Sequence, residues 1–101
     1  MQEMVRTTDG FNFILEKALS ANETVIVKIP DVSPNKKSVS DIGWQSDGDV
    51  TIYGTLSSDP ESNSAIWQEI DDNSDINKAT YALKVVSGES ACNIVIRVIF
   101  N

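Results

Sequence analysis

The fold of this chain is decided by the stretch ACNIVIRVIF, residues 91–100. Successive side chains of a β-strand point to opposite faces, so the stretch divides into two sets. One set is wholly apolar and consists of Ile94, Ile96, Val98 and Phe100. The other set is half apolar, because Val95 and Ile99 alternate with Asn93 and Arg97. A strand of this kind is typical of a sheet that is covered on both sides, by a second sheet and by a neighbouring chain or loop. The stretch therefore predicts an all-β domain with a partner.

Similar short runs of β-forming residues recur along the chain between turn-forming residues. They are 24–29, 39–44, 50–56, 65–70 and 80–86. Residues 11–19 fit an amphipathic helix as well as a strand, and their β surroundings favour a strand. The sequence thus predicts an antiparallel β-sandwich or jelly-roll-like fold of about six to eight strands. We expect residues 1–10 to form an N-terminal tail and residues 11–101 a single β-sandwich domain.

Two connections have the composition of tight hairpin turns. Asp47-Gly48 is a strong short hairpin signal, and residues 87–90 read as a second hairpin connector. Gly54, in the middle of a strand, predicts a bulge or the close approach of a bulky group. Leu56 is expected on the inward face of the same strand.

Composition excludes several classes of function. Lys plus Arg number 8 against 15 for Asp plus Glu, which gives a formal net charge of -7 in 101 residues. This charge repels nucleic acid and anionic membranes, so we expect neither as a partner. No apolar run reaches the length of a membrane span, and the N-terminus lacks the apolar stretch of a secretory signal. The sequence therefore predicts a protein made in the cytoplasm.

The chain has no histidine and one cysteine, Cys92. Histidine is the commonest general base and zinc ligand, and its absence removes the usual catalytic triads. A single cysteine cannot form an internal disulfide, and we expect Cys92 to be a small core residue. The sequence predicts no catalytic residue, no enzymatic activity and no cofactor apart from the calcium considered next.

One acidic loop resembles the opening of a calcium-binding loop. Asp71, Asn73 and Asp75 provide alternating side-chain oxygens, which suit a hard cation. The sixth position is Ile76 where an EF-hand has glycine, and the twelfth is Ala82 where it has glutamate. The loop is therefore a candidate for a looser calcium site, and a solvated turn between strands is the alternative.

Three aromatic residues are candidates for a sugar-binding face, because exposed rings stack on pyranose rings. They are Trp44, Tyr53 and Trp67. In small sandwiches tryptophans more often fill the core, so we expect Trp44 and Trp67 there. Tyr53 lies on the polar parity of its strand and is the better candidate for an exposed contact.

The second half of the chain contains an ordered series of motifs. They are Tyr53-Gly54-Thr55-Leu56, Trp67-Gln68-Glu69-Ile70, Ile76-Asn77, Tyr81-Ala82-Leu83-Lys84-Val85 and Ile96-Arg97-Val98-Ile99. This series resembles small virion proteins of tailed bacteriophages and prophages. The resemblance implies a compact, oligomeric β-sandwich that decorates a capsid or forms part of a fibre or tail. It carries over no catalytic or binding residue.

The leading hypothesis is thus a non-enzymatic virion structural protein, located in the virion or the host cytoplasm, that binds copies of itself and other virion proteins. Val86, Val95 and Ile99 are the candidate interface residues, together with Tyr53. In the alternative arrangement, the apolar interface residues lie under the 11–19 segment of the same chain. The alternative function is a carbohydrate- or ligand-binding β-sandwich module that uses calcium.

Overall fold

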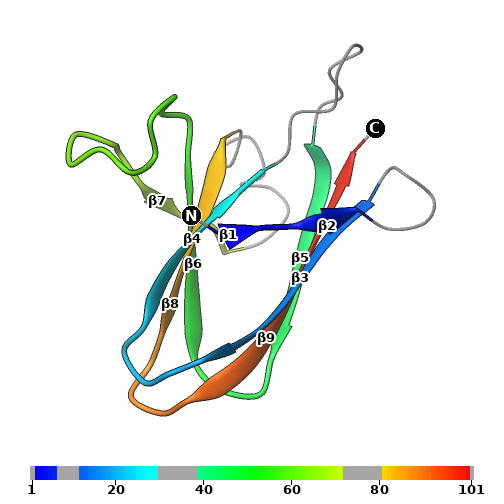
Figure 1. Ribbon diagram of the computed structural model, residues 1–101, viewed down its shortest axis with the longest axis vertical. Helices are drawn as coiled ribbons and strands as arrows, with labels where there is room; N and C mark the ends of the chain where they lie inside the picture. The colour runs from blue at the N-terminus through cyan, green and yellow to red at the C-terminus, as the bar shows by residue number, and fades with distance from the viewer. Residues whose placement is uncertain (1, 7–11, 30–38, 72–80, 101) are drawn as a thin grey trace.

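The computed structural model describes residues 2–6, 12–29, 39–71 and 81–100. Within these ranges the chain forms nine strands and no helix, and the strands make two sheets (Figure 1). The predicted all-β sandwich is therefore confirmed. The segment that fitted both helix and strand is a strand.

Six strands have five or more residues: β3 (Asn12–Leu19), β4 (Thr24–Lys28), β5 (Val39–Ser46), β6 (Val50–Thr55), β8 (Ala82–Ser87) and β9 (Cys92–Phe100). Three have two residues: β1 (Gln2–Glu3), β2 (Val5–Arg6) and β7 (Gln68–Glu69). The first sheet has the order β1-β4-β8-β6-β7, and the second sheet has the order β2-β3-β9-β5. All neighbouring strands are antiparallel except β1 and β4.

The two sheets are joined by three connections at one end of the sandwich. Residues 20–23, 47–49 and 88–91 each lead from one sheet to the other, and Figure 1 shows them together at the lower end. We call this the closed end. The strands β4, β8 and β6 lie side by side in the first sheet, and β3, β9 and β5 lie in the corresponding order in the second sheet. Each of the three connections therefore joins two strands that occupy corresponding positions in the two sheets.

This arrangement corrects the two predicted hairpins. β5 and β6, which flank Asp47-Gly48, belong to different sheets, as do β8 and β9. Turn-forming residues allow a chain reversal, but they do not specify whether the second strand pairs with the first or crosses to the opposite sheet.

The core lies between the sheets and follows the predicted parity. In β9, the side chains of Ile94, Ile96 and Val98 are buried, whereas Val95 and Arg97 are exposed. The facing sheet contributes the buried side chains of Val27, Ile52, Leu83 and Val85. Cys92 belongs to the same buried cluster, as expected.

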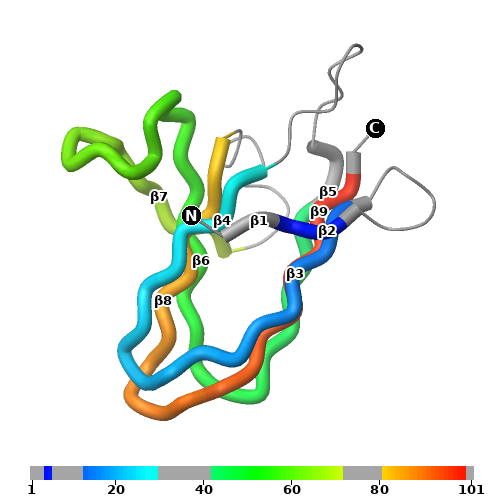
Figure 2. Tube along the Cα trace, in the orientation of Figure 1, coloured from blue at the N-terminus to red at the C-terminus, as the bar shows by residue number. Residues whose placement is uncertain are grey.

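Residues 2–6 pair with both sheets, although the sequence predicted an N-terminal tail over residues 1–10. Gln2 pairs with Val27 in the first sheet, and Val5 pairs with Ile14 in the second. Met4, between the two short strands, is 8% exposed and belongs to the core. Residues 2–6 therefore tie the edges of β4 and β3 together (Figure 1), and Figure 2 shows the Cα traces of β4 and β3 in different halves of the view. This bridge was missed because two-residue strands carry too little periodicity to be recognised.

Two expectations for the β6–β7 region are wrong. Leu56 is 61% exposed because β6 ends at Thr55, and Ile66 is 80% exposed because only Gln68–Glu69 of the expected strand pairs. Of the two alternatives for Gly54, the bulge is excluded, since the β6–β8 register is continuous through it, and the close approach of a bulky group stays a prediction.

Candidate binding surfaces

The four predicted interface residues do not form one surface. Val86 and Tyr53 lie on strands of the first sheet, on the face opposite the buried Val85 and Ile52. Val95 and Ile99 lie on β9 in the second sheet, on the face opposite its buried residues. The two pairs are therefore on opposite outer faces of the sandwich, and no single flat contact includes all four.

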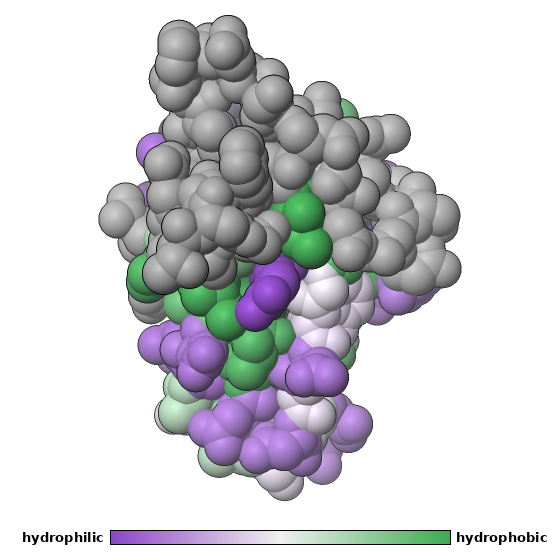
Figure 3. All heavy atoms as spheres, turned by 90° about the vertical axis from the view of Figure 1, so that its right-hand side faces the viewer, coloured by the Kyte–Doolittle hydropathy of each residue, from purple (hydrophilic) through white to green (hydrophobic). Residues whose placement is uncertain are grey.

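The outer face of the second sheet is partly apolar and open. Val95 is 36% exposed and stands in register with Glu16 of β3 and Gln45 of β5. Val5, at the edge of the same sheet, is 67% exposed. In Figure 3, which faces this side of the molecule, green hydrophobic surface lies between purple polar residues.

The 11–19 segment does not cover this face. As β3 it lies beside β9 in the same sheet, with Leu15 paired to Ile96. The alternative arrangement considered from the sequence is therefore wrong for Val95 and Ile99.

The outer face of the first sheet carries a lysine held between two aromatic rings. The Lys84 Nζ is 4.9 Å from the centre of the Tyr53 ring and 4.8 Å from that of Trp67. Each such cation–π contact contributes about 0.5–1 kcal/mol at a partly exposed site. Trp67 is thus outside the core, contrary to expectation, whereas Trp44 packs against the core as predicted.

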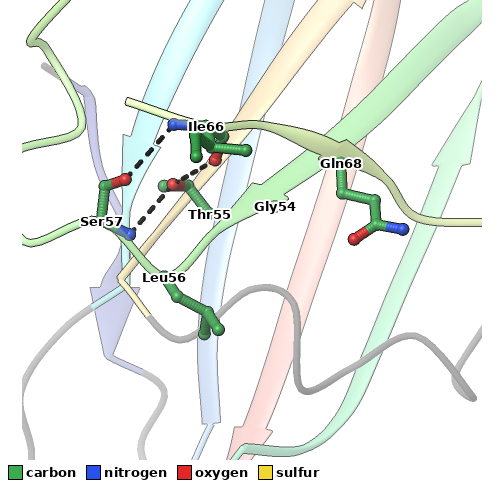
Figure 4. Close-up of a pocket in the computed structure, with 6 residues that line it drawn as sticks. All are labelled: Gly54, Thr55, Leu56, Ser57, Ile66 and Gln68. Atoms are coloured by element: carbon green, nitrogen blue, oxygen red, sulfur yellow. Dashed lines mark hydrogen bonds between the residues drawn. The ribbon is translucent and has the colours of Figure 1, made fainter. Parts of the chain in front are cut away.

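A pocket of about 350 Å³ lies where β6 ends and the chain returns to β7 (Figure 4). It is lined by Gly54, Thr55, Leu56, Ser57, Ile66 and Gln68. Its rim is fixed by hydrogen bonds: the Thr55 hydroxyl donates to the Ile66 carbonyl at 2.7 Å and accepts from the Ser57 amide at 3.0 Å. The pocket therefore presents the exposed side chains of Leu56 and Ile66 beside backbone and hydroxyl groups.

Sequence reasoning missed this pocket because both apolar residues were assigned to strand interiors. The sequence contains one indication of it, the polar run 57–64 between Leu56 and Ile66, which places both apolar residues next to a loop.

The candidate calcium loop falls mainly outside the described residues. Asp71 is exposed, and Asn73 and Asp75 lie beyond the described ranges. Among the residues that the structure does describe, no group of three or more His, Cys, Asp or Glu side chains is placed to hold a metal ion. No described segment forms a helix of the length and hydrophobicity needed to cross a lipid bilayer.

The most distinctive electrostatic feature lies at the closed end. The Asn93 backbone amide donates to Asp47 Oδ1 at 2.7 Å, and the Asn93 side-chain amide donates to Oδ2 at 3.0 Å. These hydrogen bonds, the backbone one first, hold the pKa of the Asp47 carboxyl below its usual range. The pair fixes the β5–β6 connection against β9 and serves the fold.

Comparison with known proteins gives no match, whether with protein-family models, curated proteins or solved structures.

Proposed function

We propose that this chain is a non-enzymatic structural subunit of a phage or prophage virion, which assembles with copies of itself and binds capsid or tail partners. The observation that carries the assembly part is the exposed, partly apolar outer face of the second sheet. The virion part rests on the resemblance of the motif series between residues 53 and 99 to small virion proteins.

The outer face of the second sheet suits a protein contact better than solvent. Its central strand places Val95 and Ile99 beside Arg97, and the edge of the sheet adds the exposed Val5. Interfaces combine apolar side chains with arginine in this way. Burial of apolar area stabilises such a contact by about 25 cal/mol per Å².

Two matched substitutions test which face is used. Val95→Lys places a cation on the second sheet opposite Glu16. The monomer is expected to stay folded, because the cross-strand pair has opposite charges. Val86→Lys makes the same change on the first sheet, between Thr24 and Thr51. We expect Val95→Lys to lower the native mass measured by light scattering and Val86→Lys to leave it at the wild-type value. A Val95→Lys variant with wild-type mass contradicts the proposed contact face.

The virion assignment has its own test, the genes that flank the coding sequence. Neighbouring capsid, tail or fibre genes are the expected result. A neighbourhood of unrelated metabolic genes counts against it.

A second function is favoured by the pocket between the end of β6 and β7. An apolar pocket with hydroxyl and backbone groups at its rim can accept a small ligand such as a sugar. This function predicts a change in tryptophan fluorescence on addition of glycans, lost in Ile66→Asp. With calcium in the 71–75 loop, it also predicts a rise in melting temperature on addition of calcium. Absence of both effects removes this function.

A further inference from the structure

The four edges of the two sheets differ in length. β1 and β7 end the first sheet and β2 ends one side of the second, and each has two residues. β5 ends the other side of the second sheet and has eight residues. Very short edge strands prevent further strand pairing, whereas a long edge is a template for another chain. β2 pairs only with Phe13 and Ile14, so residues 15–19 of β3 also lack an outer neighbour among the described strands. The β5 edge, which we define as the side of Val39–Ser46 away from β9, is the longest such unpaired edge.

The hydrogen-bond parity of β5 identifies the groups on this edge. The Asp47 amide donates to the Asn93 carbonyl, and the register is continuous from Asp41 to Ser46. Because antiparallel strands alternate the direction of their backbone groups, residues 41, 43 and 45 point theirs toward β9. Ile42, Trp44 and Ser46 then point their backbone N–H and C=O groups to the opposite side, where no described strand pairs with them.

Gly43, at the centre of this edge, is not required by any described neighbour within the chain. It is exposed, its φ lies outside the left-handed region, and an added Cβ would meet no atom within 4 Å. Glycine in a strand costs about 0.5–1 kcal/mol relative to alanine. By contrast, a Cβ on Gly48 would lie 2.7 Å from the Cys92 Cβ. Glycine without an internal reason in a strand often marks the close approach of another backbone.

We propose that the β5 edge pairs antiparallel with the β5 edge of a second copy of this chain, around a twofold axis at Gly43. This inference rests on the proposed self-assembly and specifies one of its contacts. Ile42 and Trp44 of one copy then exchange backbone hydrogen bonds with Trp44 and Ile42 of the other. The two Gly43 residues form a non-hydrogen-bonded pair, in which Cα atoms approach to about 4.5 Å.

The second copy fits this edge because the edge is self-complementary. Pairing centred on Gly43 sets Asp41 opposite Gln45 of the other copy, within the regular part of β5 that follows the register shift between Val39 and Asp41. Although each chain carries a net charge of -7, no two acidic residues are then directly opposed. A twofold contact of this kind is closed, so it forms a dimer with one continuous sheet.

Cysteine cross-linking of the full chain tests the pairing and its register. In Gly43→Cys the two new thiols are directly opposed, at a Cα separation that a disulfide allows. In the matched variant Gln45→Cys, the equivalent residues of the two copies are about 14 Å apart along the strand, which is too far. Both variants keep the native Cys92, which is 6% exposed and gives both the same background.

We expect mild oxidation to convert Gly43→Cys to a covalent dimer at least tenfold faster than Gln45→Cys. Equal rates overturn the inference. If neither variant cross-links while the wild-type chain has an oligomeric native mass, the β5 pairing is wrong and the proposed self-assembly stands. A wild-type mass of a single chain overturns both.

A charge-exchange experiment checks the twofold axis without new covalent bonds. Gly43→Glu and Gly43→Lys each place like charges opposite one another, so each variant alone is expected to show a lower mass than the wild type. An equimolar mixture is expected to restore the mass, because Glu and Lys are then opposed. A mixture that stays at the lower mass contradicts an axis at Gly43.

Discussion

The closed end and the β5 edge use the same residue type in opposite ways. At the closed end the glycines are closely packed within the chain: a Cβ on Gly48 would lie 2.7 Å from the Cys92 Cβ, and one on Gly88 would come 3.1 Å from the Asp49 Cβ. On the β5 edge, Gly43 has open space around it. The described residues thus account for the glycines of the closed end, whereas they do not account for Gly43.

Hydrogen bonding makes the same distinction. At the closed end the three connections bond to one another: the Asn22 amide donates to the Gly88 carbonyl at 2.8 Å, and the Gly88 amide donates to the Asp49 carbonyl at 2.9 Å. Asn22 adopts a positive φ of 55° to make this contact. Backbone groups on the β5 edge have no such partners among the described strands. The comparison separates the part of the molecule that maintains the fold from the part available to a partner.

The largest expected effect is at Gly48. Gly48→Ala forces a Cβ against the Cys92 Cβ, so we expect the free energy of unfolding to fall by about 1–3 kcal/mol, the usual cost of overpacking. Denaturant unfolding of the monomer measures it. The control is Gly43→Ala, and equal losses for the two variants contradict the distinction between the two regions.

Ser87→Ala is expected to have the next largest effect. The Ser87 hydroxyl donates to the Ser20 carbonyl at 2.6 Å and accepts from the Glu23 amide at 2.7 Å. Its removal leaves both partners unpaired in a partly buried site, and we expect a loss of about 1–2 kcal/mol. The exposed Ser90 in the same connection provides the control, since Ser90→Ala should change little. A loss below that of Ser90→Ala would show that this hydroxyl does not hold the closed end.

Asp47 gives the closed end a pH dependence. Its pKa is lowered in the folded state, so its stabilising contribution is complete above the unfolded pKa and is lost as the pH falls through the folded one. We expect Asp47→Asn to be less stable than the wild type at neutral pH and the difference to shrink below about pH 4. Urea unfolding at several pH values measures this.

Asn93→Ala should keep most of this pH dependence, because the backbone amide of residue 93 remains as the main donor. A difference between Asp47→Asn and the wild type that does not change with pH would rule out this role for the carboxylate.

The smallest effect is expected at Gly43 itself. Gly43→Ala should raise the stability of the monomer by up to about 0.5–1 kcal/mol, because alanine restricts the unfolded chain and its Cβ meets no atom. Denaturant unfolding at a concentration that keeps the chain monomeric measures it. A loss of stability would mean that the monomer needs this glycine, and the β5 edge would then resemble the closed end.

The sequence predicted the long strands because their patterns are local. In β9 the alternation of buried and exposed residues from Ile94 to Val98 follows directly from a period of two. The same reasoning failed at Leu56 and Ile66, which look like core residues but lie where strand pairing has ended. Pairing depends on residues distant in sequence, and apolar character alone does not report it.

The candidate sites were harder to predict for the same reason. Val86 and Val95 have similar patterns, yet they lie on opposite faces because the chain crosses between sheets at residues 88–91. The role of Gly43 could not be inferred, since it depends on the space around a Cβ and on the position of β5 at an edge. Both facts depend on the order of the strands, which is set by pairing between residues distant in sequence.

The most direct test of self-assembly is the native mass of the wild-type chain, measured by light scattering across a dilution series. Assembly through the second sheet predicts a mass that is a multiple of the single chain and that falls on dilution. A single-chain mass at every concentration would contradict it and leave the pocket between the end of β6 and β7 as the remaining candidate site.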